Sequence, residues 1–311
     1  MLAVKTLPHK LMTFKHETLL MGTRFEFSVV GNDPHWADDR FQDAINEVNR
    51  VEKLISAFNE ESSVNEINRN AGIKPVKTNV EIFHLISRSL QISELTYGSF
   101  DITYHTVDKD KEQSKPTSSK KIRQNPINYQ SVILDEKAQT VFLADKNMRI
   151  GFGSNSKGYA ADRAKYVLQL NGVSRGVINA GGDLITWGLQ PDNEPWTIAA
   201  ADQGQEYQPF ANVAIGNMAI ATSVNTVKYT AALSQKSLSA IDHKDGFPVS
   251  GIKSVSIIST TAEFADSLSA TIMQMGINAG LYLINQLNQI ACVIIDDQDR
   301  VYTSKNITVN I

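Results

Sequence analysis

The sequence predicts an α+β protein in which amphipathic helices pack against antiparallel strands. In several long stretches apolar residues recur every three or four positions, and shorter stretches alternate apolar with polar residues between turn-forming ones. The chain has 311 residues, 42% of them hydrophobic and 20% charged, which suffices to bury a sizeable core. We expect a single domain over residues 1–311, with an exposed insertion near residues 107–128, where the composition is polar and aperiodic.

The first half of the chain supplies helices separated by strands. Helical stripes cover residues 38–58 and 79–97, the second ending at Gly98, and hydroxyl residues near 62–68 cap a short helix between them. Met21-Gly22-Thr23 forms a turn that opens the first strand. The strands expected in this half occupy residues 25–29, 132–134, 140–143 and 148–152.

The stretch 151–183 is predicted to form an anion-binding cradle. It contains a glycine-serine turn, a helix starting at Ser156 or Lys157, a strand at 176–179 and a second glycine turn before Asp183. Backbone amides at a helix start and in glycine turns can face an anion, and Lys157 adds positive charge.

The last third of the chain adds more strands and two helices. The helices are expected at 264–275 and 279–287, with Asp266 in the first turn of the former, where a carboxylate complements the helix dipole. The strands expected in an antiparallel sheet occupy residues 197–201, 210–213, 218–221, 254–259, 290–295 and 300–302.

Charge and composition exclude several classes of protein. The net charge of −3 and the lack of a Lys/Arg cluster argue against nucleic-acid binding and against a polybasic membrane patch. Cys292 is the only cysteine, so no disulfide forms within the chain, and six scattered histidines lack the spacing of a zinc site. No stretch is apolar enough to span a membrane, and residues 1–15 lack the apolar core of a signal peptide, so we expect a soluble protein.

Two nucleotide-loop motifs fail, and one acylase motif remains as an alternative. The third glycine of a dinucleotide fingerprint is Ser156, and Lys157 precedes rather than follows the glycine of a Walker A loop. A serine acylase of the penicillin-binding type would use Ser154-x-x-Lys157, Ser223-x-Asn225 and Lys244-Asp245-Gly246 in that order. That hypothesis leaves the other glycine and carboxylate motifs unexplained.

A set of short motifs distributed over most of the chain resembles the FAD:protein FMN transferase (ApbE) family. No single motif is diagnostic, but their order and spacing together are specific. They are Met21-Gly22-Thr23, Ser56-Ala57-Phe58 to Ile67-Asn68, Gly98-Ser99-Phe100-Asp101-Ile102-Thr103, Lys157-Gly158-Tyr159-Ala160-Ala161-Asp162, Asn179-Ala180-Gly181-Gly182-Asp183, Ala221-Thr222-Ser223, Ile241-Asp242, Gly246-Phe247-Pro248-Val249, and Ala265-Asp266-Ser267-Leu268.

The resemblance implies an ApbE-type fold with two lobes around a flavin cleft, between the cradle and residues 98–103. It also implies binding of FAD and magnesium, and transfer of FMN to a threonine of a target flavoprotein. Asp266 would be the catalytic residue and also a magnesium ligand. The other implied magnesium ligands are Ser154 and Ser269, and the implied flavin-nucleotide contacts are Met21, Phe58, Ser99, Phe100, Asp101, Lys157 and Ile241.

Three positions depart from the family pattern and keep a second function open. Gly151 stands where the family usually has an aspartate, Ser239 where it has a histidine, and Ala270 where it has a threonine. These changes favour a non-catalytic FAD-binding or flavin-trafficking protein as the alternative. Family members often work outside the cytoplasm, and any membrane association would come from an N-terminal signal that this sequence lacks.

Overall fold

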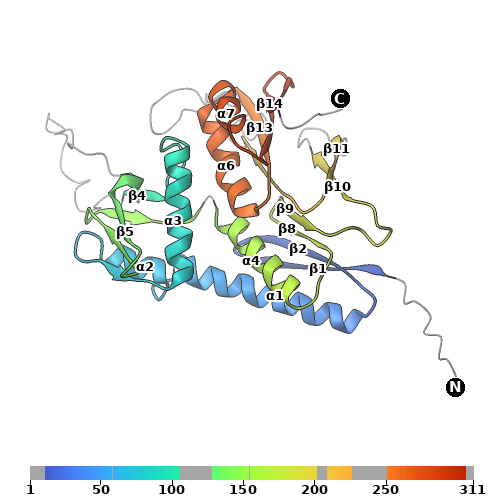
Figure 1. Ribbon diagram of the computed structural model, residues 1–311, viewed down its shortest axis with the longest axis horizontal. Coiled ribbons are helices and arrows are strands. Elements are labelled where there is room, and N and C mark those ends of the chain that lie inside the picture. Colours follow the sequence, from blue (N-terminus) through green and yellow to red (C-terminus); the bar gives the residue numbers. More distant parts are fainter. Residues whose placement is uncertain are drawn as a thin grey trace, which may run out of the picture. The chain divides into compact units, whose positions relative to one another are not determined.

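The computed structural model describes residues 11–57, 59–105, 128–153, 155–201, 209–225 and 251–305. The chain divides into two compact units, one made of Met1–Asn49 with Ser154–Ile311 and the other of Arg50–Gly153 (Figure 1). Helix α1 (Pro34–Ile55) begins in the first unit and ends in the second. That the whole chain is one domain stays a prediction, and each unit is described by itself.

The first unit is built on an eight-stranded sheet. Its strand order is β1-β2-β8-β9-β12-β13-β14-β15, and each pair in the described residues is antiparallel. The strands are β1 (Met12–Leu20), β2 (Thr23–Gly31), β8 (Gly176–Ala180), β9 (Asp183–Trp187), β12 (Ala219–Val224), β13 (Ile252–Ser259), β14 (Ala291–Asp296) and β15 (Val301–Thr303). This confirms the α+β class, since helices and antiparallel strands share one unit.

Two tight turns lie at the same end of this sheet. Met21 and Gly22, both with positive φ, join β1 to β2, and Gly181 and Gly182, also with positive φ, join β8 to β9. Because β2 pairs with β8 from Phe25 and Ala180 onward, the two turns are neighbours. Gly181 has a φ of +67°, which favours glycine, and a Cβ there would lie 2.6 Å from Thr23 Oγ1 unless that side chain moved.

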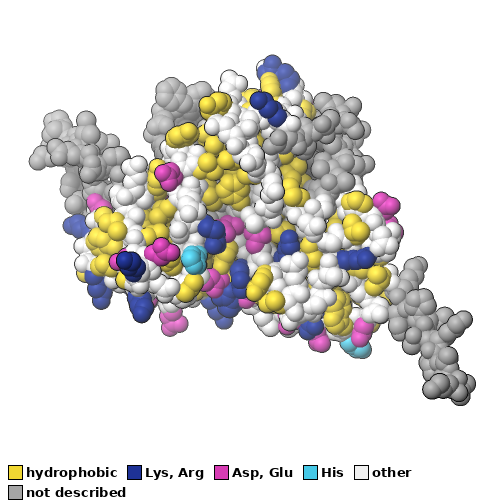
Figure 2. All heavy atoms as spheres, viewed as in Figure 1, with side chains coloured by type: hydrophobic (Ala, Val, Ile, Leu, Met, Phe, Trp, Pro, Cys, Tyr) yellow, Lys and Arg dark blue, Asp and Glu magenta, His cyan; other side chains and the backbone are white. Residues whose placement is uncertain are grey.

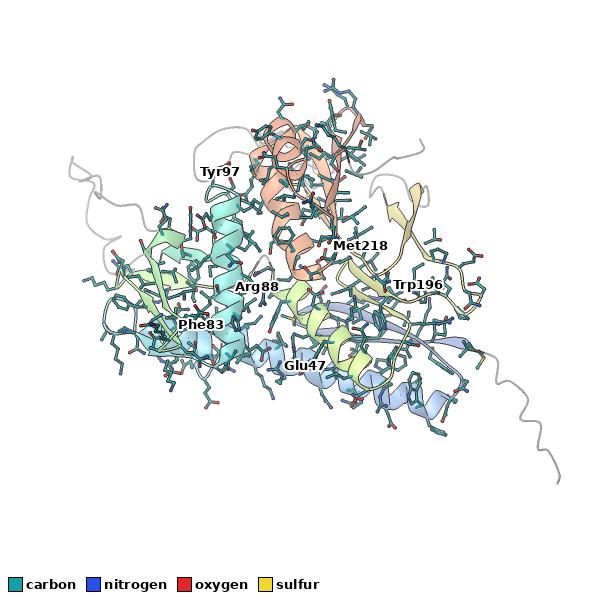
Figure 3. The ribbon with its side chains drawn as sticks, in the orientation of Figure 1. Glu47, Phe83, Arg88, Tyr97, Trp196 and Met218 are labelled. Atoms are coloured by element: carbon teal, nitrogen blue, oxygen red, sulfur yellow. The ribbon has the colours of Figure 1, made fainter. Side chains whose placement is uncertain are left out.

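Helices α4 (Ser156–Leu170), α6 (Ala262–Met275) and α7 (Ile277–Ile284) pack on this sheet, with α4 and α6 against each other (Figure 1). The first part of α1 joins α4 through Glu47, labelled in Figure 3, whose buried carboxylate accepts a hydrogen bond from Arg163 Nε at 2.9 Å. The core beneath is apolar and includes fully buried Phe25, Phe27 and Trp187. Helix α4 is thereby packed against α1, α6 and the sheet.

The second unit combines helices with two small sheets. Helices α2 (Ser63–Arg69) and α3 (Val80–Leu95) accompany the sheet β3-β6-β5 and the pair β4-β7. These strands are β3 (Val76–Lys77), β4 (Thr103–His105), β5 (Val132–Asp135), β6 (Thr140–Leu143) and β7 (Met148–Ile150), with a 3-10 turn η2 (Tyr129–Ser131) before β5. The buried Asn68 side chain links α2 to β7, since it donates to Ile150 O and accepts from Ile150 N at 3.0 and 2.8 Å.

Most predicted elements are confirmed, and two predictions are corrected. Residues 197–201 and 210–213 form β10 (Trp196–Ala201) and β11 (Pro209–Ile215), a separate two-stranded ribbon rather than part of the main sheet. Helix α6 begins at Ala262, two residues earlier than predicted, so Asp266 lies in its second turn and Glu263 is the acidic residue of the first. The predicted insertion at 107–128 lies, except for its last residue, outside the described residues.

The described surface carries charged groups of both signs. Figure 2 shows basic, acidic and hydrophobic side chains interspersed over the described part of the viewed face, without an extended patch of one sign. In the described ranges every helix is too short or too polar to cross a bilayer.

Candidate functional site

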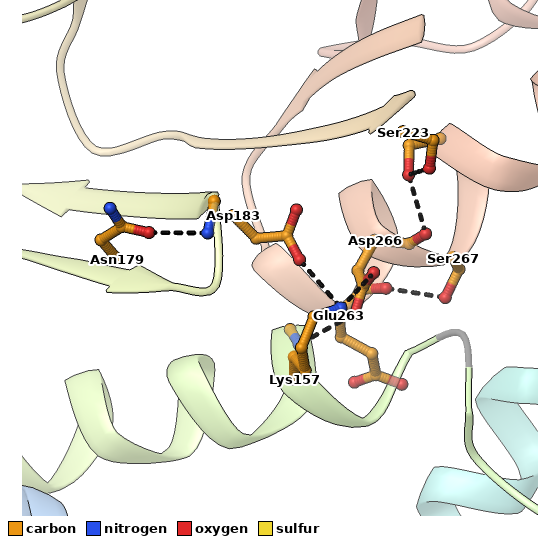
Figure 4. Close-up of polar contacts among 10 residues, drawn as sticks. Lys157, Asn179, Asp183, Ser223, Glu263, Asp266 and Ser267 are labelled. Atoms are coloured by element: carbon orange, nitrogen blue, oxygen red, sulfur yellow. Dashed lines mark hydrogen bonds and ion pairs between the residues drawn. The ribbon is translucent and has the colours of Figure 1, made fainter. Parts of the chain in front are cut away.

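Three elements of the first unit bring a lysine and two aspartates together. Lys157 lies in the first turn of α4, Asp183 begins β9 directly after the glycine turn, and Asp266 lies on α6. Lys157 Nζ is 3.2 Å from Asp183 Oδ2 and 3.4 Å from Asp266 Oδ1, so the ammonium bridges the two carboxylates (Figure 4). The two carboxylate side chains are only 8% and 9% exposed, whereas the lysine side chain is 30% exposed.

Backbone amides hold each carboxylate in place. Gly158 N donates to Asp266 Oδ2 at 3.1 Å, and Thr222 N donates to the Asp183 carboxylate. Gly158 N belongs to the first turn of α4, whose amides have no partner within the helix. This amide therefore binds the protein's own carboxylate.

The second glycine turn also differs from the predicted cradle. Gly181 N donates to Arg24 O at 2.9 Å, and Gly182 N donates to Asn179 Oδ1 at 2.8 Å (Figure 4). Both amides bind acceptors of the protein itself, so the turn does not present them to an anion as expected. It serves instead to place Asp183 beside Lys157.

Burial and the neighbouring charges shift the pKa values of all three residues in the cluster. Burial, together with the neighbouring charge of Asp266, raises the pKa of Asp183 to about 6 even though Lys157 opposes the shift. Burial also raises the pKa of Asp266 above its ordinary value, against the effect of Lys157 and the Gly158 amide. Burial alone would lower the pKa of Lys157, but the two aspartates outweigh it and the pKa is raised. The lysine therefore stays protonated between two largely buried carboxylates.

Hydroxyl groups lie beside Asp266. Ser269 Oγ, on the same helix, donates to the Asp266 backbone carbonyl at 3.2 Å and lies 2.8 Å from Ser223 Oγ on β12. Either hydroxyl can donate in the serine pair. The pair ties β12 to α6, and a role for Ser269 as a metal ligand stays a prediction.

Asp162 fixes α4 against the start of α6. Its two carboxylate oxygens accept hydrogen bonds from Ala262 N and Glu263 N at 3.0 and 2.8 Å, so it caps the helix that carries Asp266. Burial raises the pKa of Asp162 to about 6, despite these two amides. The same α4 segment thus presents Lys157 and sets the position of the helix that carries Asp266.

The raised pKa of Asp162 makes part of the folding stability depend on pH. The folded pKa of about 6 exceeds the ordinary 3.8, so this stabilisation is complete below pH 3.8 and is lost as the pH rises through about 6. Relative to Asp162→Asn, the wild type should lose about 1–3 kcal/mol of unfolding free energy between pH 4.5 and 7.5. Urea unfolding of both proteins measures this difference. Asp39→Asn, on the exposed face of α1, is the control, and a pH-independent difference for Asp162→Asn would contradict the prediction.

The predicted flavin-contact turn lies in the second unit, after α3. Phe100 is 2% exposed, and its amide donates to Thr96 Oγ1 at 3.1 Å. Both Asp101 oxygens accept backbone amides, from Thr103 at 2.8 Å and from Tyr129 at 3.1 Å, while Ser99 is exposed. Phe100 and Asp101 thus stabilise the turn, and contact of Ser99, Phe100 and Asp101 with a flavin stays a prediction.

The remaining predicted residues are placed only in part. Met21 is half-buried in the β1–β2 turn, at the same end of the sheet as Asp183. Phe58, Ser154 and Ile241 lie outside the described residues, as does Ser239. The predicted residues that the structure brings together are Lys157, Asp266 and Ser269.

Sequence reasoning missed Asp183, Asp162 and Ser223 as members of this cluster. All three belong to motifs recognised in the sequence, but nothing in the spacing of distant motifs shows which side chains meet. One signal was available for Asp183, because a carboxylate directly after a pair of turn glycines is held rigidly at the end of a strand.

Comparison with known proteins identifies relatives over nearly the whole chain. The sequence profile of the ApbE family matches residues 21–294. An FAD:protein FMN transferase of Klebsiella pneumoniae is 26% identical over 301 residues, covering 94% of this chain and 90% of that relative. The Escherichia coli K12 protein of the same name is 22% identical and covers 82% of this chain and 76% of its own length.

Solved structures of the family share the fold. The flavinyl transferase ApbE of Pseudomonas stutzeri superposes with a TM-score of 0.74 at 20% identity, covering 95% of this chain and 96% of that one. The flavin transferase ApbE of Vibrio cholerae gives a TM-score of 0.73 at 18% identity, with 96% and 98% covered. These likenesses confirm the predicted type of fold.

Proposed function

Because the chain belongs to the ApbE family, we propose that it is a flavin transferase that moves FMN from FAD to a protein. Its curated relatives are named FAD:protein FMN transferases, which supports this activity. We propose further that the reaction depends on magnesium and that the acceptor is a threonine of a target flavoprotein. The observation that carries the proposal is the bridged pair of buried carboxylates, Asp183 and Asp266, beside Lys157 at a helix start.

The donor chemistry of the cluster fits a magnesium ion. Magnesium takes oxygen ligands, is bound by one or two carboxylates, and leaves its remaining positions to water and substrate phosphates. Within the described part of the chain no three His, Cys, Asp or Glu side chains gather to hold a metal by themselves. Asp266 would hold such an ion, and substrate phosphates would supply further oxygen ligands.

In the proposed reaction, Asp266 and Lys157 would have different roles. The acceptor hydroxyl oxygen forms a bond to the phosphorus of the FMN half and releases its proton to the solvent, the pyrophosphate P–O bond breaks, and AMP leaves with the bonding electrons. Asp266 holds the ion, and Lys157 offers its ammonium to the phosphates. A bound magnesium supplies neutralisation of the charge that develops on the phosphate oxygens.

A non-catalytic FAD-binding protein is the second candidate, and Ala270 favours it. Ala270 lies one helical turn after Asp266 on α6, so a methyl group stands where a hydroxyl would add an oxygen ligand. The acylase alternative is weakened by the structure. Lys157 is held as a cation by two carboxylates, and the raised pKa makes it unsuited to act as a base.

A flavinylation assay tests the proposed function. The full chain is incubated with FAD, magnesium and an acceptor protein of a curated relative, and covalent flavin is read by in-gel fluorescence and intact mass. We expect an FMN adduct and AMP release, both abolished by EDTA and by an acceptor whose threonine is replaced with valine. FAD binding without AMP release would establish the non-catalytic alternative instead.

A further inference from the structure

We propose that Lys157 is a built-in counter-ion that takes the place of the divalent cation on Asp266, and that Asp183 is the positioning residue that keeps this lysine when the cation binds. The inference rests on the proposed function, because it assumes a cation site at Asp266. In the cation-free protein the Lys157 ammonium contacts both carboxylates. When the ion binds to Asp266, the ammonium must move away from that carboxylate.

The contact distances show that Lys157 is shared between the two aspartates and does not form a tight ion pair with either one. A tight ammonium–carboxylate hydrogen bond is about 2.7–2.9 Å long. Lys157 Nζ lies instead at 3.2 Å from Asp183 and 3.4 Å from Asp266, at intermediate range from both. The ammonium therefore lies between the two carboxylates and is not bound tightly to either one.

Only the lysine in this cluster is free to move. Asp266 is held through its second oxygen by Gly158 N, and Asp183 is held by Thr222 N, so both carboxylates are tied to backbone on separate elements. Lys157 reaches them through a flexible four-carbon stem that is 30% exposed. A modest rotation lets it leave Asp266 and remain on Asp183.

The charge balance favours this exchange. Two carboxylates and one ammonium leave the pocket with one negative charge, which attracts a divalent cation. With the ion on Asp266 and the lysine on Asp183, the pocket carries one positive charge. That sign suits a pyrophosphate, so the lysine need not leave the site to make it ready for FAD.

Magnesium titration of the full chain without FAD or acceptor tests the inference by calorimetry. Removing the competitor in Lys157→Met should tighten magnesium binding by about 10-fold or more. Lys157→Arg, whose guanidinium can pair with both carboxylates at once, should weaken it by a similar factor of about 10. Lys137→Met, in the exposed turn between β5 and β6, is the matched control and should bind as the wild type does.

A double-mutant cycle separates positioning from direct ligation. Asp183→Asn leaves the lysine to Asp266 alone and also removes one negative charge from the pocket, so it should weaken magnesium binding. In the Lys157→Met background only the loss of charge remains, and the weakening should be smaller. An equal loss in both backgrounds would make Asp183 a ligand and overturn its assigned role. If Lys157→Met binds magnesium as the wild type does, or more weakly, Lys157 does not compete with the ion. If Lys157→Met does not fold, unchanged magnesium binding by Lys157→Arg would refute the competition instead.

These outcomes are distinct from those of the flavinylation assay. A protein that shows the predicted change in magnesium affinity but no FMN adduct would keep the inference and lose the proposed transferase activity. Transfer that proceeds fully in EDTA, with no magnesium binding by any variant, would remove the cation site and with it the inference.

Discussion

Asp266→Asn is expected to reduce flavin transfer by about 10³-fold or more, the largest effect on activity that we predict for a single side chain. The change removes the carboxylate that we propose as the anchor of the cation. Lys157 Nζ and Gly158 N each donate to a different carboxylate oxygen of Asp266. Asparagine keeps only one of these two acceptors and puts an NH₂ donor in place of the other. One of these groups must lose its partner, so the geometry of the pocket is disturbed together with its charge.

Stability should change far less than activity in this variant. Asp266 is buried beside Asp183, and its charge contributes to the raised pKa of that residue, so removing it relieves repulsion while one hydrogen bond is lost. Adduct formation at saturating FAD, over a range of magnesium concentrations, measures the activity, and thermal unfolding checks the fold. Asp39→Asn, exposed on α1, controls for the loss of one carboxylate. An Asp266→Asn protein within about 10-fold of the wild-type rate would contradict the role assigned to this residue.

The sequence was sufficient for most of the local structure because most helices and strands have their own pattern, although β1, β3, β4 and β9 were not predicted. Asn79 predicted the start of α3, where it accepts from Ile82 N, and Gly98 predicted its end. The start of α6 was missed by two residues because Thr261 makes no side-chain cap and the capping oxygens come from Asp162, a hundred positions earlier. Such a cap leaves no local signal.

The candidate site was predictable only in part, because local motifs identify single residues but not the distant residues that they contact. Lys157 and Asp266 were found from motifs, and the structure brings them together as expected of one site. Their bridging by Asp183 depends on the pairing of β8 with β9 and of β9 with β12, which no short motif reveals. The predicted role of the glycine turn as an anion cradle was wrong because its amides bind Arg24 O and Asn179 Oδ1.

Gly158→Ala should cause the largest loss of stability that we predict, although alanine normally favours a helix over glycine by about 1 kcal/mol. Gly158 lies where α4 meets the start of α6. A Cβ there would be 2.3 Å from Ala262 O, 2.6 Å from Ala262 C and 2.8 Å from Glu263 N. All three atoms are backbone, so no side-chain rotation can relieve the overlap, and the two helices must separate. We expect a loss of about 3 kcal/mol or more in the free energy of unfolding.

Urea unfolding of Gly158→Ala measures this loss, and magnesium titration shows its consequence for the site. Moving α6 away from α4 also pulls Asp266 from Gly158 N and from Lys157, so the variant should bind magnesium differently from the wild type wherever it remains folded. Gly216→Ala is the matched control, because a Cβ at Gly216 meets nothing within 4 Å, and its stability should stay within about 0.5 kcal/mol of wild type. If Gly158→Ala were as stable as the wild type, the close approach of α4 and α6 could not be what aligns Lys157 with Asp266.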